Sequence, residues 1–245
     1  MPGQNYPLRY IRQIPLIGEE GQDRLARAEV CIFGAGGLGS PAALYLASAG
    51  VGTIHLVDGD KVEESNLNRQ ILHGSASIGL SKVTSAKNQI LALNPGIRVR
   101  SSQDWIGDGN AAALIDTADL VIDALDNFEA RYVLNREARR MAVPLVHGAV
   151  SGFAGQATTV LPRVGPCLRC IVPHPPPEEV HPVLGAVAGV IGSIQALEAI
   201  KYLTGLGELL SGKMLLWDGM RCECELLPLE RDPLCRICGE GQESE

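Results

Sequence analysis

Residues 29–39 read Glu-Val-Cys-Ile-Phe-Gly-Ala-Gly-Gly-Leu-Gly, an apolar run followed at once by glycines. The apolar run is typical of a strand that a parallel sheet buries on both faces. Gly34, Gly36 and Gly39 satisfy the spacing G-x-G-x-x-G, with Gly37 between them. These glycines suit a tight turn whose backbone amides approach a phosphate at a helix start. The stretch predicts a nucleotide-binding strand-turn-helix unit, although such turns also serve packing alone.

Carboxylates follow two further apolar stretches. Residues 53–57 run into Asp58-Gly59-Asp60, roughly 20 residues after the last glycine, where a dinucleotide-binding unit carries its ribose-binding acid. Residues 120–124 run into Asp126 and Asn127. Ligands bind at the carboxyl ends of strands in open α/β sheets, so both carboxylates are candidate site residues. The alternatives are an Asp-Gly turn at Asp58 and a helix cap at Asp126.

Cationic and amide side chains occur between these carboxylates. Residues 65–70 read Ser-Asn-Leu-Asn-Arg-Gln and are interpreted as a recognition loop. Lys82 stands in the first turn of a helix expected from Ser81 to Leu93, where the helix dipole disfavours a cation unless an anion lies nearby. Two cations for phosphates and a carboxylate that could hold Mg²⁺ favour ATP over hydride transfer. The Walker lysine motif does not follow the glycines.

The remaining periodicity predicts a Rossmann-like, doubly wound α/β fold, with a largely parallel sheet extended by antiparallel strands. Residues 5–18, between and around two prolines, are expected to form an extended or briefly helical arm outside the core. We expect one domain over residues 1–245: an arm (1–18), a nucleotide-binding half (19–147) and a second half (148–245). Expected helices cover residues 19–28, 38–49, 81–93, 127–141 and 184–204, and expected strands cover 97–101, 144–147, 214–217 and 223–227, with antiparallel strands in 148–162.

Four of the 7 cysteines form two C-x-x-C pairs. This spacing predicts a closed, four-thiolate structural zinc site made by Cys167, Cys170, Cys235 and Cys238. An iron-sulfur cluster and a redox disulfide are the alternatives. Cys31 lies in an apolar strand and is expected to be inert. Cys222 and Cys224 are expected to alternate along a strand without a known partner.

Composition narrows the classes of protein. A net charge of −7 and a pI near 5.3 argue against binding to duplex nucleic acid. The longest uncharged apolar stretch, Pro182 to Ile194, is too short for a membrane span. We expect no secretion signal, and hence a reducing, cytoplasmic location.

Together these motifs resemble the ThiF, MoeB and HesA family, E1-like activators of ubiquitin-like sulfur carriers. The resemblance covers nearly the whole chain. It is carried by residues 9–13 (Arg-Tyr-Ile-Arg-Gln), the glycine turn, residues 58–60, residues 65–70, Lys82, residues 126–127, both cysteine pairs and residues 192–201.

The resemblance implies roles for individual residues. Asp58 would bind the ribose, Arg69 and Lys82 the phosphates, and Asp126 the Mg²⁺ ion. Arg12 would reach into the ATP site of a partner subunit, because the family is dimeric. Ser65, Asn66, Asn68 and Asn127 complete the implied nucleotide-binding set.

The implied reaction is adenylation of the C-terminal glycine of a carrier protein ending in Gly-Gly, before sulfur displaces AMP in molybdopterin, thiamine or related biosynthesis. Some family members carry a nucleophilic cysteine in the crossover loop, but residues 171–189 contain none. We therefore expect no covalent thioester. We also expect a separate sulfur-donor protein, because the sequence shows no appended rhodanese domain. A nicotinamide-dependent oxidoreductase is the alternative, but it leaves Arg69, Lys82 and Asp126 without a role. A degenerate binding scaffold would have lost these residues.

Overall fold

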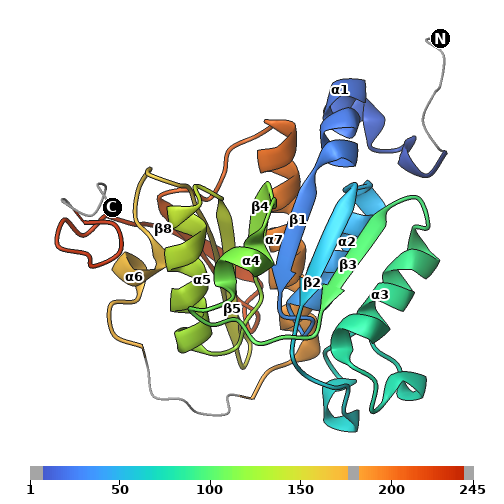
Figure 1. Cartoon of the computed structure of the whole chain (residues 1–245). Helices are drawn as coiled ribbons and strands as arrows, with labels where there is room; N and C mark the ends of the chain where they lie inside the picture. Colours follow the sequence, from blue (N-terminus) through green and yellow to red (C-terminus); the bar gives the residue numbers. More distant parts are fainter. Residues whose placement is uncertain (1–7, 176–181, 240–245) are drawn as a thin grey trace.

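The computed structural model describes residues 8–175 and 182–239. Its central feature is one eight-stranded sheet in the order β3-β2-β1-β4-β5-β6-β7-β8 (Figure 1). β3, β2, β1, β4 and β5 pair in parallel, and β6, β7 and β8 extend the sheet in antiparallel pairing. The predicted fold class is confirmed. The strands are β1 (Glu29–Phe33), β2 (Thr53–Val57), β3 (Arg98–Ser102), β4 (Leu120–Asp123), β5 (Leu145–Ser151), β6 (Ala154–Val160), β7 (Lys213–Asp218) and β8 (Glu223–Pro228).

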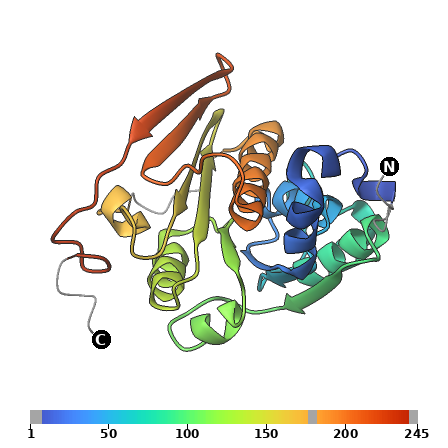
Figure 2. The same cartoon turned by 90° about the horizontal axis from the view of Figure 1, so that it is seen from above.

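Helices cover both faces of the sheet, so the alternating side chains of β1 enter two different cores. Val30 and Ile32 point into a core shared with α2 and α7, whereas Cys31 and Phe33 point into a second core shared with α4 and α5. Figure 2 shows α4 and α5, in green, and α7, in orange, on opposite sides of the sheet. The helices are η1 (Leu8–Tyr10), α1 (Ile14–Arg27), α2 (Gly39–Ala49), η2 (Glu64–Asn66), η3 (Ser75–Ser77), α3 (Lys82–Leu93), α4 (Ala111–Ile115), α5 (Phe128–Arg140), α6 (Leu168–Ile171) and α7 (Gly185–Thr204).

The long helix α7 lies against α2, α1 and the sheet. By length and composition it meets the requirements of a membrane span. A core helix passes the same test, and Ile191, Ala196 and Ala199 of α7 are almost completely buried in the first core.

The N-terminal segment departs from expectation. Helix α1 begins at Ile14, and its backbone bends at Gly18, which has φ of 73°. The Tyr10 side chain is buried, and its hydroxyl accepts a hydrogen bond from Asn94 Nδ2 at 2.9 Å. The expectation that this segment stays outside the core is wrong at Tyr10, because the ring finds a polar partner at the end of α3.

Other differences concern short or boundary segments. The sequence did not predict η2, η3, α4 or α6, which are each five residues or fewer. The division of the chain into two halves at residue 147 stays a prediction. Strand β5 runs across this position without interruption. Cys222 lies in the turn before β8 with φ of 54°, so the expectation that it belongs to a strand is wrong. Within the crossover loop, residues 176–181 lie outside the described residues.

The contact between α7 and α2 is testable with two glycines of the same helix. A Cβ at Gly192 would lie 2.3 Å from the backbone oxygen of Leu38, whereas a Cβ at Gly189 meets nothing within 4 Å. Both changes to alanine gain about 1 kcal/mol of helix propensity. We therefore expect Gly189→Ala to stabilise the protein and Gly192→Ala to destabilise it by about 1–3 kcal/mol through overpacking. Urea unfolding measures both, and equal stability of the two variants would contradict the close contact.

Candidate active site

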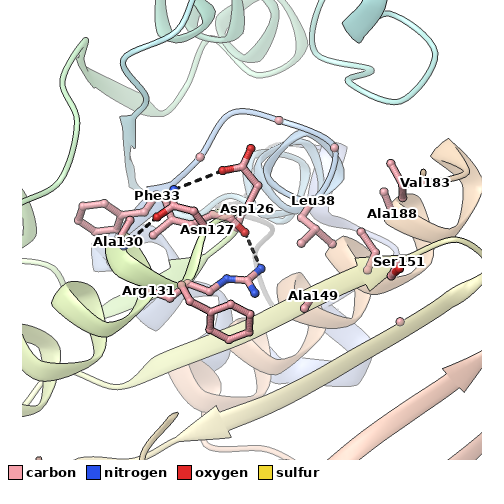
Figure 3. A pocket seen from close by; sticks show the side chains of 18 of the residues that line it. Phe33, Leu38, Asp126, Asn127, Ala130, Arg131, Ala149, Ser151, Val183 and Ala188 are labelled. Atoms are coloured by element: carbon pink, nitrogen blue, oxygen red, sulfur yellow. Dashed lines mark hydrogen bonds between the residues drawn. The ribbon is translucent and has the colours of Figure 1, made fainter. Parts of the chain in front are cut away.

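A cavity of about 1600 Å³ opens at the carboxyl ends of the parallel strands. It is the position expected for a ligand in an open α/β sheet. Figure 3 shows Asp126, Asn127 and Arg131 on one side of the cavity, and Ser151, Val183 and Ala188 on the other. Residues predicted to form the site line this cavity: Gly34, Gly36, Gly37, Asp58, Arg69, Lys82, Asp126 and Asn127.

The turn after β1 is closed by direct backbone contact. Gly34 has φ of 100°, and a Cβ at Gly39 would fall 1.8 Å from the carbonyl oxygen of Gly34. Asp58 spans this turn, because its Oδ2 accepts a hydrogen bond from Ala35 N and its Oδ1 accepts one from Asp60 N, both at 2.8 Å. The carboxylate therefore has a fixed orientation at the cavity wall, where a ribose could meet it.

Lys82 is held beside the cavity by a carboxylate that sequence reasoning did not single out. Its ammonium donates to Asp60 Oδ2 at 2.7 Å, and the lysine side chain is only 8% exposed. Asp60 thus supplies the anion whose presence the lysine at the helix start required. Arg69 Nη1 donates to the backbone oxygen of Ser65 and to Asn68 Oδ1, which orders the second cation.

Asn127, rather than Asp126, caps helix α5. Asn127 Oδ1 accepts a hydrogen bond from Ala130 N at 2.9 Å. The alternative reading of Asp126 as the cap is therefore wrong, and its exposed carboxylate lines the cavity instead. This arrangement leaves Asp126 available to a ligand or cation.

Sequence reasoning missed Arg131, which holds the Asp126 loop in place. Its Nη2 donates to the backbone oxygens of Leu125 and Gly148, and its Nε lies 3.7 Å from Asp123 Oδ1. The guanidinium is nearly buried and also lies over the Phe128 ring. The signal that could have identified it is the position of an arginine in the expected helix 127–141, three and seven residues before Leu134 and Ala138, which lie on the same buried face.

Beneath this loop lies a buried pair, Asp123 and His147. His147 Nδ1 is 2.7 Å from Asp123 Oδ2, and neither side chain is exposed. Burial lowers the pKa of His147, so the imidazole is neutral near pH 7. Gln195 of α7 donates to the backbone oxygen of Asp123 at 2.7 Å. The end of β4 is thereby tied to β5 and α7.

Several predicted residues do not reach the cavity. Ser65, Asn66, Asn68 and Gly39 are absent from its lining. The Asn66 side chain takes part in a capping box at the start of η2, where its Oδ1 accepts a hydrogen bond from Glu63 N. Asn66 therefore has a structural role. Arg12 is exposed in the segment between η1 and α1, at the edge where the strands begin, and does not line the cavity of its own chain.

The two cysteine pairs come together as predicted. The sulfur atoms of Cys167, Cys170, Cys235 and Cys238 all lie within 4.8 Å of one another, a cluster that could hold a metal ion. Burial raises the pKa of the Cys170 thiol to about 11, so a bound cation would be needed to favour the thiolate near neutral pH. Burial also raises the pKa of Cys31, consistent with its expected inertness.

Two further residues reach the cavity without having been predicted to do so. Cys224, which had no assigned partner, lines the cavity from β8. Trp105 lines it from the loop after β3. Neither position follows a recognised motif, so only the folded chain reveals it.

The geometry defines a protein of Rossmann-like fold whose candidate nucleotide cavity brings the glycine turn together with Arg69, Lys82 and the exposed Asp126 carboxylate. The chain belongs to the ThiF family, whose sequence profile matches residues 10–237. It is 44% identical to the SAMP-activating enzyme E1 of Haloferax volcanii over 95% of this chain and 89% of that protein. It is 42% identical to the sulfur carrier protein adenylyltransferase of Thermus thermophilus, over 95% of this chain and 90% of that one.

Two other comparisons define the extent of the similarity. The adenylyltransferase and sulfurtransferase MOCS3 of Anopheles gambiae is 45% identical over 95% of this chain, which spans only 55% of that protein. A crystal structure of Escherichia coli MccB with ATP superposes with a TM-score of 0.84, covering 98% of this chain and 76% of that one. Its sequence is 24% identical, so this likeness shows the fold alone.

Proposed function

We propose that this protein adenylates the C-terminal glycine of a ubiquitin-like sulfur carrier, with ATP as the second substrate. The observation that carries the proposal is the convergence of Asp58, Arg69, Lys82 and Asp126 on one cavity beside the glycine turn. The names of the relatives, which are adenylyltransferases and an E1-type activating enzyme, support it.

The residues divide the work of the reaction between binding and charge neutralisation. Asp58 binds the ribose hydroxyls, and the glycine-turn amides with Arg69 and Lys82 hold the phosphates. A carboxylate oxygen of the carrier's terminal glycine attacks the α-phosphorus, the bond from that phosphorus to the bridging oxygen breaks, and pyrophosphate leaves. Positioning and charge neutralisation account for the catalysis, and no side chain need become covalently attached.

Asp126 is the proposed ligand for Mg²⁺. Its carboxylate is exposed at the cavity, and oxygen ligands of this type suit the ion. When bound, the ion would neutralise phosphate charge as pyrophosphate departs. Arg131 keeps the Asp126 loop in place through its bond to the Leu125 oxygen.

The second part of the cavity is the proposed path of the carrier's tail. Ser151, Gln156 and Trp217 extend the wall across the antiparallel strands β5, β6 and β7. A tail ending in Gly-Gly would reach the α-phosphate along this wall. We propose that sulfur then comes from a separate donor protein; the pathway served follows from which carrier binds.

We propose that the cysteine cluster binds a structural zinc ion. Four sulfur ligands satisfy tetrahedral zinc and leave no open position for a substrate. Cys167 and Cys235 come from segments on opposite sides of α7 in the sequence, so the ion would join the segment that follows β8 to the one that follows β6. Free thiols and thiolate-bound zinc fit a reducing compartment, which supports a cytoplasmic location.

We also propose a homodimer in which Arg12 completes the ATP site of the partner subunit. Arg12 lies near the edge where the strands begin, whereas the cavity of its own chain lies at the other edge. A shallow apolar groove on α2 and α7 includes Tyr45, Ile71 and Leu197, each more than half exposed. Ile71 follows Arg69 by two residues, so a subunit seated there would lie close to the phosphate-binding loop.

Asp126→Ala should remove ATP-pyrophosphate exchange measured with a carrier ending in Gly-Gly. Loss of one such electrostatic contact costs on the order of 10² to 10³ in rate. Glu208→Ala, which removes an exposed carboxylate after the end of α7, is the matched control and should retain exchange. Wild-type exchange that survives in Asp126→Ala would contradict the assignment.

The same mixture of enzyme, carrier and ATP tests for covalent chemistry on a non-reducing gel. Cys222→Ala and Cys224→Ala should leave exchange nearly unchanged, and no thiol-sensitive adduct should form. An adduct lost in Cys224→Ala would show that this cavity-lining cysteine is a nucleophile.

Elemental analysis should find about one zinc per chain in the wild type. Cys238→Ser should lower the zinc content and the stability of the protein, because Cys238 is a buried member of the cluster. Cys222→Ser, at an exposed cysteine in a turn, is the control and should keep its zinc. A purified protein that is fully folded and free of metal would refute the proposal.

Mixing Arg12→Ala chains with Asp126→Ala chains should restore part of the exchange activity. A hybrid dimer would contain one site with both groups intact and one with neither. Chain exchange is checked by mixing two differently tagged wild-type samples. If chains exchange but activity does not return, Arg12 does not act across the dimer.

A further inference from the structure

Trp105 is an exposed aromatic residue at a ligand cavity. Its side chain is 65% exposed, and it lines the cavity from the loop between β3 and α4. Large aromatic side chains usually bury most of their surface, so an indole left open at a cavity is a candidate contact for a ligand.

The backbone around Trp105 is held by two side chains, those of Asn110 and Asp104. Asn110 Nδ2 donates to the Trp105 oxygen at 2.9 Å, and Asn110 Oδ1 accepts from Gly107 N at 2.8 Å. Asp104 Oδ1 also accepts a hydrogen bond from Trp105 N at 2.8 Å. These hydrogen bonds order the backbone from which the indole projects.

The indole itself rests on Gly59. A Cβ added at Gly59 would lie 2.4 to 2.6 Å from three indole atoms, Cε2, Nε1 and Cδ2. Gly59 does not have a positive φ, so the backbone conformation alone does not require glycine here. The glycine of the Asp58-Gly59-Asp60 motif therefore makes room for the indole beside the ribose-binding carboxylate.

The order of groups along the sheet edge places a nucleobase at Trp105. Lys82, Arg69 and the glycine turn provide the phosphate end, and Asp58 marks the ribose. Trp105 follows β3, on the other side of β2 from the glycine turn. A nucleotide with its phosphates at the turn and its ribose at Asp58 extends its base towards β3.

Charge favours the same orientation. The Asp104 carboxylate lines the cavity beside Trp105 and would repel phosphate, whereas a base is neutral. Asp108 also lines the cavity, but its carboxylate is paired with Arg136. We propose that Trp105 is the stacking platform for the purine ring of ATP, an inference that rests on the proposed function. Stacking on an aromatic ring tolerates different bases, so Trp105 contributes to nucleotide affinity without choosing between adenine and guanine.

The test measures ligand affinity by equilibrium dialysis with ATP, GTP and inorganic tripolyphosphate. Trp105→Ala should weaken the binding of ATP and of GTP by a similar factor, about 5- to 100-fold. It should leave the affinity for tripolyphosphate unchanged. Trp105→Phe should recover most of the ATP affinity. Gly59→Ala should displace the indole and weaken ATP binding, although the tryptophan itself is retained.

Fluorescence supplies an independent readout, because the chain has 2 tryptophans. In a Trp217→Phe background, Trp105 is the remaining emitter, and ATP should change its emission whereas tripolyphosphate should not. Circular dichroism confirms that each variant is folded.

The outcomes separate this inference from the proposed function. If the wild type binds no ATP, both are overturned. If it binds ATP and Trp105→Ala binds it equally well, only the stacking role is overturned. Equal weakening of tripolyphosphate would show a loop-stabilising role instead, and a raised KM for the carrier with unchanged ATP affinity would assign Trp105 to the carrier's path.

Discussion

The start of α2 lies so close to the end of β1 that any side chain at Gly39 would strike the carbonyl oxygen of Gly34. The site depends on this contact, because it holds Gly36 and Gly37 of the turn in the wall of the cavity. Asp58 fixes the Ala35 amide, and His73 Nε2 lies 2.9 Å from the Ala35 oxygen, so both sides of that residue are bonded. The turn is therefore held in place by its own hydrogen bonds, which would lower the ordering cost of ligand binding.

Two cations near the cavity each have a carboxylate partner, and a third carboxylate, that of Asp126, is exposed. Asp60 neutralises Lys82, and Asp123 lies beside Arg131, while Asp126 remains exposed. A buried lysine or arginine without a partner would pay a large desolvation cost, so these carboxylates make the cations tolerable in the apo protein. An arriving triphosphate would add negative charge near Lys82, whereas its approach to Asp126 would require a metal cation between them.

The antiparallel strands form a large part of the cavity wall. Strands β6, β7 and β8 continue the sheet beyond the parallel strands, and residues of all three line the rest of the cavity. Glu198 of α7 accepts hydrogen bonds from Thr159 of β6 and from the Leu210 amide, which fixes α7 against this extension. The cysteine cluster lies in the second core with α4 and α5, so metal binding would stabilise the half that is expected to receive the carrier.

Much of this architecture was determined by local sequence. The glycine spacing, the carboxylates after apolar runs and the two C-x-x-C pairs predicted the fold class, the position of the cavity and the cysteine cluster. Each of these signals is short-range: it depends on strand periodicity, turn geometry or ligand spacing within a few residues. That is why Asp58 and Asp126 were predicted correctly to lie at one edge of the sheet.

The tertiary structure decided the pairings that join distant segments. Asp60 could be assigned to Lys82, and Arg131 to the Leu125 and Gly148 oxygens, only once the chain was folded. Asn66 looked like a recognition residue, but the local capping box with Glu63 uses its amide. Trp105 has no motif at all, and its place on Gly59 follows from the adjacency of β2 and β3. Local sequence patterns determine which side chains a strand or helix carries. Packing between elements determines which of those side chains come into contact.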